Sequence, residues 1–197
     1  MTEKEKMEQQ MLYDANFDKE LIEMRRTAKD LCFRFNSLLP SNTEEQTKIM
    51  KQLLGKTKGS FEINAPFWCD YGSNIEIGEG FFANHNTVIL DGAKVTFGDH
   101  VFIAPNCGFY TAGHPIDYER RNAGLEYAYP IKVGDNVWFG AGVQVMPGVT
   151  IGSDVVIGAG SIVVKDIPDH SVAVGNPCRV IRAITEEDKK NTWNRKI

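Results

Sequence analysis

The sequence predicts a mainly β protein: a parallel β-helix wound from six-residue repeats, preceded by a short helical segment and interrupted by one loop. Two observations lead to this fold class. After Phe61, bulky apolar residues recur every six positions with Gly, Asn or Asp between them, which indicates a stacked repeat. Before Lys58, glycine is almost absent and residues that favour helices dominate. Composition therefore divides the chain near residue 58.

Helical periodicity predicts two or three short helices in residues 1–58. The apolar residues of the first pattern recur at spacings of three and four; they are Leu21, Met24, Ala28, Leu31, Cys32 and Phe35. A second pattern follows Pro40, where residues 41–45 have the composition of a helix N-terminus. Gly55 suits the end of that helix, because glycine readily adopts the conformation that closes helices.

The clearest repeats lie in residues 133–168, where six consecutive units of six residues share one frame. The first residue of each unit is bulky and apolar, the second is Gly in four of the six units, and the fifth is small or β-branched. Weaker units keep the frame over residues 77–93 and, after a slip of two residues, over 97–107. The repeat fails in residues 111–130, which are predicted to form a loop that leaves the stack.

The six-residue period has a physical reason. The first and fifth residues of each unit point inward, while Gly, Asn and Asp permit tight turns with positive φ. Three short strands then close one coil of 18 residues, and coils stack at the ordinary strand spacing of roughly 4.8 Å because a single coil buries too little surface. The predicted organisation is a helical segment at 1–58, a β-helix at 59–184 with its loop at 111–130, and a tail at 185–197.

Bulk properties exclude several classes of protein. The formal net charge of −4 argues against a nucleic-acid binder. The charged N-terminus lacks the apolar core of a secretory signal, and no apolar stretch approaches the roughly 20 residues that span a bilayer. The four cysteines are widely separated and predict reduced, packed thiols. We therefore expect a cytoplasmic protein that does not bind membranes.

Several short stretches narrow the family. They occupy residues 69–75, 82–84, 110–116, 136–140, 147–152, 158–168 and 175–182, and include Asp70-Tyr71-Gly72, Ala83-Asn84 and Thr111-Ala112-Gly113-His114-Pro115. Through them the sequence resembles the maltose/galactoside O-acetyltransferase group over nearly its whole length. The resemblance implies a left-handed β-helix, although parallel crossovers are generally right-handed. It also implies acetyl-CoA as the donor, no required metal, and a homotrimer with active sites between subunits.

His114 is the candidate catalytic residue. It lies where the repeat breaks, and imidazole suits the removal of a proton from a hydroxyl because its ordinary pKa lies near 6.5. From the bare sequence a surface-loop histidine is an equally good interpretation; the resemblance favours the catalytic one. It implies direct attack of the hydroxyl on the thioester, with the backbone amide of Ala141 as the candidate donor to the oxyanion. Cys107 occupies an inward fifth position, so we interpret it as a packing residue rather than a nucleophile.

Five polar residues are the candidates for binding the acceptor: the resemblance nominates Asp14, Asp70, Asn84, Asp91 and Glu126. Each has a simpler alternative. Asp91 precedes Gly92 in a turn, where Asp is common, Asp70 could orient the chain, and Glu126 could be a solvated loop residue. Asn84 is the strongest candidate because Asn is unusual at its repeat position. Arg25 could shape the pocket or belong to a solvated helix face.

Small and basic residues are the candidates for binding the donor: Ala141, Ala159, Lys165, Arg179 and Arg182. Arginine can bind phosphate through two hydrogen bonds, and small residues in the turns would let the pantetheine arm approach the backbone. Ordinary surface charge is the alternative for the three cations. Trp138 is expected to face outward, beside the CoA groove or at a subunit face. Val164 departs from the family, where Thr is frequent.

Three other functions compete with sugar acetylation. A β-helix carbonic anhydrase would need a zinc site, but His85, His100 and His114 occupy different phases of the repeat, so a shared metal site is not expected. A non-catalytic β-helix scaffold is possible because fold alone does not give function. Among acetyltransferases, a xenobiotic (antibiotic) O-acetyltransferase is the alternative, whereas a serine acetyltransferase would need a longer helical segment. Which hydroxyl compound is the acceptor stays open.

Overall fold

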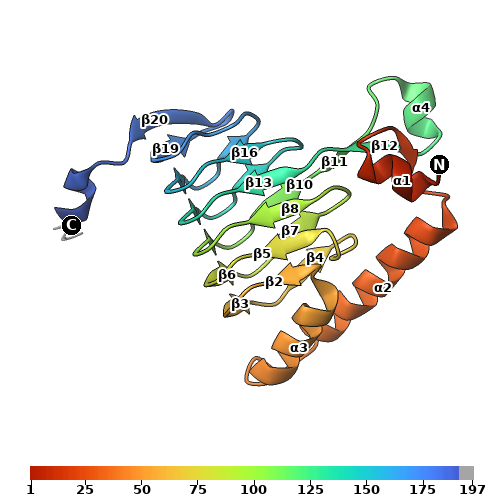
Figure 1. Cartoon of the computed structure of the whole chain (residues 1–197), viewed down its shortest axis with the longest axis horizontal. Helices are drawn as coiled ribbons and strands as arrows, with labels where there is room; N and C mark the ends of the chain where they lie inside the picture. Colours follow the sequence, from red (N-terminus) through yellow and green to blue (C-terminus); the bar gives the residue numbers. More distant parts are fainter. Residues whose placement is uncertain (191–197) are drawn as a thin grey trace.

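The computed structural model describes residues 1–190 and is a parallel β-helix whose N-terminal helices run from its first coils to the small sheet formed with residues 111–130 (Figure 1). Three sheets form the sides of the coil, and successive strands pass from one sheet to the next. We call them the first, second and third faces, and we name each edge by the two faces that it joins. The predicted fold class, a mainly β chain of stacked parallel coils, is confirmed.

The first face contains β2 (Lys56–Thr57), β5 (Ile75–Ile77), β8 (Val95–Phe97), β13 (Ile131–Val133) and β16 (Thr150–Ile151). The second face contains β3 (Phe61–Ile63), β6 (Phe81–Ala83), β9 (Phe102–Ile103), β14 (Trp138–Phe139), β17 (Val156–Ile157) and β19 (Ser171–Val174), and ends in the antiparallel strand β20 (Arg179–Ala183). The third face contains β4 (Phe67–Cys69), β7 (Thr87–Leu90), β10 (Gly108–Tyr110), β15 (Gln144–Val145) and β18 (Ile162–Val163).

Aromatic rings fill the inside of the coil. Phe81, Phe97, Phe109 and Phe139 are all buried, and consecutive ring centroids lie 5.2, 5.0 and 5.1 Å apart. Two of the three contacts are edge-to-face, an arrangement that aromatic quadrupoles favour. Cys107 is also buried, which confirms that it packs in the core.

The turns explain two positions of the repeat. The fourth residue adopts a positive φ in most units, and it is Gly, Asn, Asp or His; His100 (56°) and Asn136 (56°) are examples. The second residue is often Gly because the next coil leaves no room. A Cβ on Gly98 would lie 2.7 Å from the backbone carbonyl of Gly134.

The coils do not all have the same length. Trp68 pairs with Val88 and Val88 with Gly108, steps of 20 residues, whereas Gln144 pairs with Ile162, a step of 18 residues. The two extra residues lie at the third-to-first edge, between Cys69 and Ile75 and between Ile89 and Val95, where six positions separate the inward residues. This edge is the source of the slip in the sequence repeat.

Residues 111–130 also leave the stack at the third-to-first edge, but they are not the loop that the sequence predicts. They contain β11 (Ala112–Gly113), α4 (Tyr118–Asn122) and β12 (Leu125–Ala128). Strand β12 pairs with β11 on one side and with β1 (Tyr13–Asp14) of the N-terminal segment on the other. This excursion is therefore an ordered three-stranded sheet, held by an N-terminal strand that sequence periodicity did not predict.

The N-terminal helices are α1 (Glu3–Glu8), α2 (Lys19–Asn36) and α3 (Thr43–Leu53), so α2 is longer than the short helices predicted. Asp18 caps α2 by accepting from the Leu21 N–H, and Cys32 of α2 lies 3.7 Å from Cys69 of β4, sulfur to sulfur. All four cysteines are free and buried. Within the described range no helix is both long and apolar enough to cross a bilayer. The tail begins with the short helix η1 (Glu186–Lys190); residues 191–197 lie outside the described range.

Candidate active site

The small sheet of the excursion aligns three side chains from distant parts of the sequence. Tyr13 of β1 pairs with Glu126 of β12, and Gly113 of β11 pairs with Tyr127. In antiparallel strands this register places His114, the next residue, beside Glu126. Tyr13, Glu126 and His114 therefore stand in one row at the third-to-first edge.

His114 is held in one orientation by a main-chain contact. Its Nδ1 lies 3.0 Å from the carbonyl oxygen of Leu125, so Nδ1 carries the proton and donates it to that carbonyl. Its Nε2 then has a free lone pair and lies 3.8 Å from Oε1 of Glu126. The side chain is 47% exposed, so Nε2 is available to take a proton from a bound hydroxyl.

Glu126 connects His114 to the N-terminal strand. Its Oε2 accepts a hydrogen bond of 3.2 Å from the Tyr13 hydroxyl. Burial raises the pKa of the Glu126 carboxyl, while the nearby His114 charge and the Tyr13 hydrogen bond oppose that rise. Tyr13 itself is buried, and burial raises its pKa so that it remains a neutral donor.

Arg25 of α2 ties the N-terminal segment to the turn after β4. It donates to the Tyr71 hydroxyl at 2.6 Å and to the Ala15 carbonyl, and its guanidinium lies 5.6 Å from the centre of the Tyr71 ring. Burial raises the pKa of Asp70 beside it, opposed by the charges of Arg25 and Lys29. Arg25 therefore shapes this site, one of the two roles that the sequence left open for it.

Asp91 is buried beneath the site rather than exposed at its surface. Its carboxylate accepts from the N–H groups of Asp70, Tyr71 and Asn74 at 3.0, 2.8 and 3.3 Å. Burial is the main cause that raises its pKa to about 6. These contacts make Asp91 the residue that fixes the turn carrying Asp70, which matches the turn alternative for its role.

Asp14 lies next to the aligned row but uses its carboxylate locally. One oxygen accepts from the N–H groups of Asn16 and Phe17, at 3.1 and 2.9 Å, which is a typical Asx turn. Its own N–H donates to Glu3 of α1. Asp14, Asp70, Glu126 and His114 thus gather at the third-to-first edge.

Three other predicted residues lie at the second-to-third edge instead. Asn84 follows β6 and lines a hollow of about 280 Å³ with Phe82, Phe102 and Trp138. Ala141 and Ala159 occupy stacked exposed turns, where the Gly160 N–H donates to the Ala141 carbonyl at 2.8 Å. The Ala141 N–H makes no hydrogen bond within residues 1–190. One chain therefore carries two groups of predicted residues on different edges.

The predicted cations are more dispersed. Lys165 is exposed at the third-to-first edge beside Val164. Arg179 and Arg182 lie on β20, and Arg182 donates to both carboxylate oxygens of Asp188, at 2.8 and 2.9 Å. Arg182 must release Asp188 before it can bind a phosphate with the same atoms.

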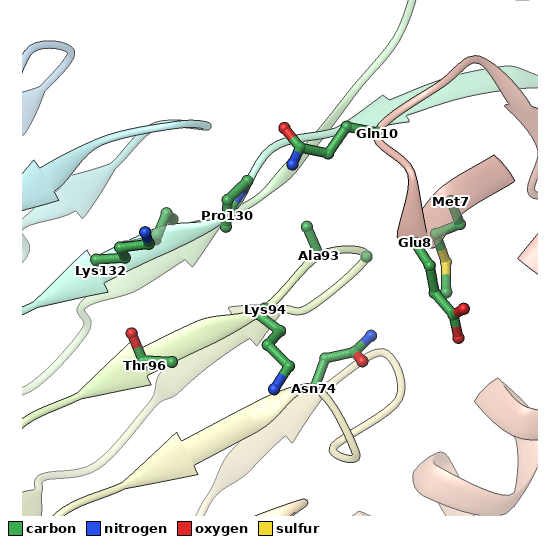
Figure 2. A pocket seen from close by; sticks show the side chains of 11 residues that line it. Met7, Glu8, Gln10, Asn74, Ala93, Lys94, Thr96, Pro130 and Lys132 are labelled. Atoms are coloured by element: carbon green, nitrogen blue, oxygen red, sulfur yellow. The ribbon is translucent and has the colours of Figure 1, made fainter. Parts of the chain in front are cut away.

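A separate pocket of about 400 Å³ lies between α1 and the first face (Figure 2). Met7 and Gln10 line one side, and Lys94, Thr96 and Lys132 line the other. None of the residues predicted to act in catalysis or binding contributes to it. The size of this pocket therefore does not identify it as the active site.

Tyr13 and Tyr71 are site residues that the sequence predictions did not include. Strand β1 is only two residues long, too short to show an alternating pattern. Tyr13, Ala15 and Tyr71 belong to a small apolar cluster separate from the main core. A buried tyrosine usually needs a hydrogen-bond partner for its hydroxyl. This expectation was the only signal that could have identified Tyr13 and Tyr71 as site residues.

Two family models match the chain. The maltose acetyltransferase hexapeptide capping motif matches residues 6–59, and the bacterial transferase hexapeptide model of six repeats matches residues 130–165. The first covers α2, α3 and the end of α1, and the second covers the regular coils after the excursion. The two matches lie on either side of the excursion.

Proteins of known family are similar over almost the whole length. A protein of Saccharomyces cerevisiae, named as a presumed acetyltransferase without an acceptor, is 57% identical over 94% of both chains. The crystal structure of a maltose O-acetyltransferase from Clostridium difficile 630 is 51% identical, with a TM-score of 0.92 over 94% of this chain and 99% of that one. A galactoside acetyltransferase in complex with coenzyme A is 43% identical, with a TM-score of 0.92 over 96% and 94% of the two chains.

Proposed function

The chain belongs to the maltose/galactoside O-acetyltransferase group of hexapeptide-repeat transferases, and we propose that it transfers an acetyl group from acetyl-CoA to a sugar hydroxyl. The observation that carries the proposal is the geometry of His114. Its Nδ1 faces the Leu125 carbonyl and its Nε2 is free at a partly exposed edge lined by carboxylates. Such an imidazole is a suitable general base for a hydroxyl.

The proposed reaction proceeds without a covalent enzyme intermediate. His114 Nε2 removes the proton of the acceptor hydroxyl, and the oxygen attacks the thioester carbonyl. The tetrahedral oxyanion accepts from the Ala141 N–H, which has no partner in the described residues. When the intermediate collapses, the carbon–sulfur bond breaks, and the CoA thiolate takes the proton back from His114.

This mechanism needs residues from two edges of the coil. His114 stands at the third-to-first edge and Ala141 at the second-to-third edge, with the third face between them. A neighbouring subunit could supply the missing group. We therefore place each active site between two subunits of a homotrimer.

The outer surfaces of the faces support this assembly. Outward residues of the first face are polar; along its ladder they are Lys56, Glu76, Thr96, Lys132 and Thr150. The second face presents the paired ladder Phe82, Phe102 and Trp138, with Phe102 and Trp138 about half exposed. Exposed apolar ladders of this kind favour burial against another chain. Trp138 would then lie at a subunit face.

Acceptor and donor would approach from opposite sides of that interface. Asp14 and Asp70 would accept hydrogen bonds from sugar hydroxyls, with Asn84 added by the neighbouring subunit, whereas the carboxylate of Glu126 faces Tyr13 and His114. Ala141 and Ala159 leave their turns open to the pantetheine arm, and Lys165, Arg179 and Arg182 would neutralise the phosphates. The similar galactoside acetyltransferase was solved with coenzyme A, which supports the choice of donor. Acetyl-CoA and the free thiols favour a cytoplasmic enzyme.

Free-thiol release tests the proposal directly. Purified protein is mixed with acetyl-CoA and a panel of maltose, galactosides, glucose and hydroxyl-bearing antibiotics. We expect release that requires a sugar, and a particle mass three times that of the chain. Thiol release with antibiotics but not with sugars would identify the protein as a xenobiotic O-acetyltransferase. Absence of CoA binding would favour the non-catalytic β-helix scaffold.

A further inference from the structure

We propose that Glu126, held by the Tyr13 hydroxyl, is the positioning residue of this site: its carboxylate stabilises the imidazolium that His114 becomes when it takes the acceptor proton. The inference rests on the proposed acetyl transfer and extends it to the N-terminal strand. Because Glu126 acts through His114, its effect falls on the rate of the chemical step. Tyr13 acts one contact further away, through Glu126.

The two nitrogens of His114 have separate partners. The Leu125 carbonyl faces Nδ1 and fixes the tautomer, so orientation needs no carboxylate. Glu126 Oε1 lies 3.8 Å from Nε2, the nitrogen that gains the proton. The new positive charge therefore forms next to a negative one, and such a pair interacts more strongly in a partly buried site than in water.

Tyr13 directs the Glu126 carboxylate toward His114. It binds Oε2 at 3.2 Å and leaves Oε1 for His114. Tyr13 cannot turn away freely, because it is 1% exposed and packs with Met7, Leu21 and Ala128. Its strand β1 is paired with β12 in register. The N-terminal segment thus contributes to the catalytic edge itself.

The charges around Glu126 make the protonation state of its carboxyl depend on the charge of His114. Burial and, to a lesser extent, Asp70 raise the pKa of Glu126, whereas His114, the Tyr13 hydrogen bond and Arg25 lower it. The carboxylate is consequently favoured most when His114 is positively charged. Charge on His114 and charge on Glu126 support one another at the step where the proton moves.

Three single variants test the proposal in the acetyl-transfer assay. In Glu126→Gln, which keeps the shape and the Tyr13 contact, we expect kcat to fall about 10- to 100-fold with the acceptor KM within about threefold. The acid limb of kcat/KM moves to lower pH because the imidazolium loses its anion. In Tyr13→Phe we expect a smaller fall of kcat, about three- to tenfold. Glu119→Gln, the same change on exposed α4, is the matched control and leaves kcat unchanged.

Two further variants separate positioning from folding. Glu126→Asp restores the charge, and we expect it to recover part of the activity lost in Glu126→Gln. Tyr13→Phe placed in the Glu126→Gln background should lower kcat by less than about twofold, because no charge remains to be directed. An undiminished Tyr13→Phe effect in that background, or a Glu126→Asp variant no better than Glu126→Gln, would overturn the proposal.

An NMR titration of the His114 imidazole provides a readout that needs no acetyl transfer. We expect its midpoint to move to lower pH in Glu126→Gln and to stay in place in Glu119→Gln. If the midpoint does not move, the positioning role is wrong even where activity is lost. If it moves while the wild type acetylates no hydroxyl, the charge pair stands and the proposed function fails.

Discussion

The second-to-third edge and the third-to-first edge of the same β-helix are built in opposite ways. At the first of these, Ala141 and Ala159 sit in short stacked turns whose residues follow the six-residue frame. At the second, turns are two residues longer in the early coils, and the excursion with His114 leaves the stack. Around Ala141 and Ala159 the second-to-third edge presents backbone and small side chains, whereas the third-to-first edge presents Asp70, Glu126 and His114.

This difference shows how a repeat protein divides its tasks. The frame positions strands and needs the same residue types in every coil. Acid–base chemistry needs a particular set of side chains at one place, which a strict repeat cannot supply. His114, Glu126, Asp14 and Asp70, the candidate catalytic and acceptor-binding residues apart from Asn84, accordingly lie where the period is broken. The predictions below test each edge against the other.

The largest expected effect is on the irregular edge. In His114→Asn we expect kcat/KM to fall about 10²- to 10⁴-fold because the proposed general base is lost, with an unchanged melting temperature since the side chain is half exposed. His100→Asn is the matched change on a regular edge, where a φ of 56° suits Asn. Thiol release and thermal melts measure both. Equal activity losses in the two variants would remove the contrast between the edges.

The second prediction concerns stability and pH. The folded-state pKa of Asp91 is raised to about 6, above the ordinary value of about 3.9. The folded protein therefore holds this proton more tightly than the unfolded chain, and stability falls as pH rises from about 4 to about 6. We expect the free energy of unfolding of the wild type, relative to Asp91→Asn, to be higher by about 2 kcal/mol at pH 4 than at pH 7. Urea denaturation at both pH values measures it.

Asp99 lies on the regular first-to-second edge, and its contribution to stability should change with pH in the opposite direction to that of Asp91. Its hydrogen bond with Lys58 and the Glu79 N–H lower its pKa. Its contribution to stability is present above the ordinary Asp pKa and is lost as pH falls further. Relative to Asp99→Asn, the wild type should thus lose stability on acidification. If Asp91 and Asp99 showed the same trend, the result would contradict the assignment of Asp91 as a buried turn residue and of Asp99 as a partly exposed one.

The third prediction is confined to the regular edge. Ala141→Leu places a branched side chain where the pantetheine arm is proposed to pass, so we expect the KM for acetyl-CoA to rise about tenfold. The acceptor KM and the melting temperature should change little, because Ala141 is exposed. Ala123→Leu makes the same substitution on the excursion. A larger change in acceptor KM than in acetyl-CoA KM would move the donor site away from this edge.

The smallest effect is expected from the tail. Asp188 occupies the Arg182 guanidinium through two hydrogen bonds, so Asp188→Asn should free the arginine and lower the KM for acetyl-CoA about two- to threefold. High salt should reduce the difference because the pair is exposed. Glu186→Gln, which breaks only the Lys189 pair, should have no effect. A higher KM in Asp188→Asn would show that the pair itself is needed.

Much of the fold could be predicted from the sequence because each position of the six-residue repeat has a fixed place in the coil. The inward residues, the glycines at the second position and the break at residue 111 all follow from six-residue spacing. The slip of two residues was visible as well, and the structure assigns it to one edge. Periodicity cannot predict a contact that is not repeated along the chain. The pairing of β1 with β12 is such a contact, because it occurs once and involves only two residues of each strand.

The site was predictable only in part for the same reason. His114 and Glu126 could be named from the family resemblance, but their 3.8 Å contact depends on a register between strands that no pattern reveals. Burial was also hidden. Asp91 looks like an ordinary surface turn residue in the sequence, whereas three N–H groups surround its carboxylate below the surface.

On the third face, coils of 18 and 20 residues stack in the same register. Each strand is therefore aligned by the strands above and below it, and surplus length is absorbed at one edge. Insertions there change the loops without shifting any strand, whereas insertions at the other edges disturb turns that contact the next coil. Such a frame can acquire a new acceptor pocket by lengthening a loop while its core stays as it is, which makes the third-to-first edge the natural place for evolution, or an engineer, to change specificity.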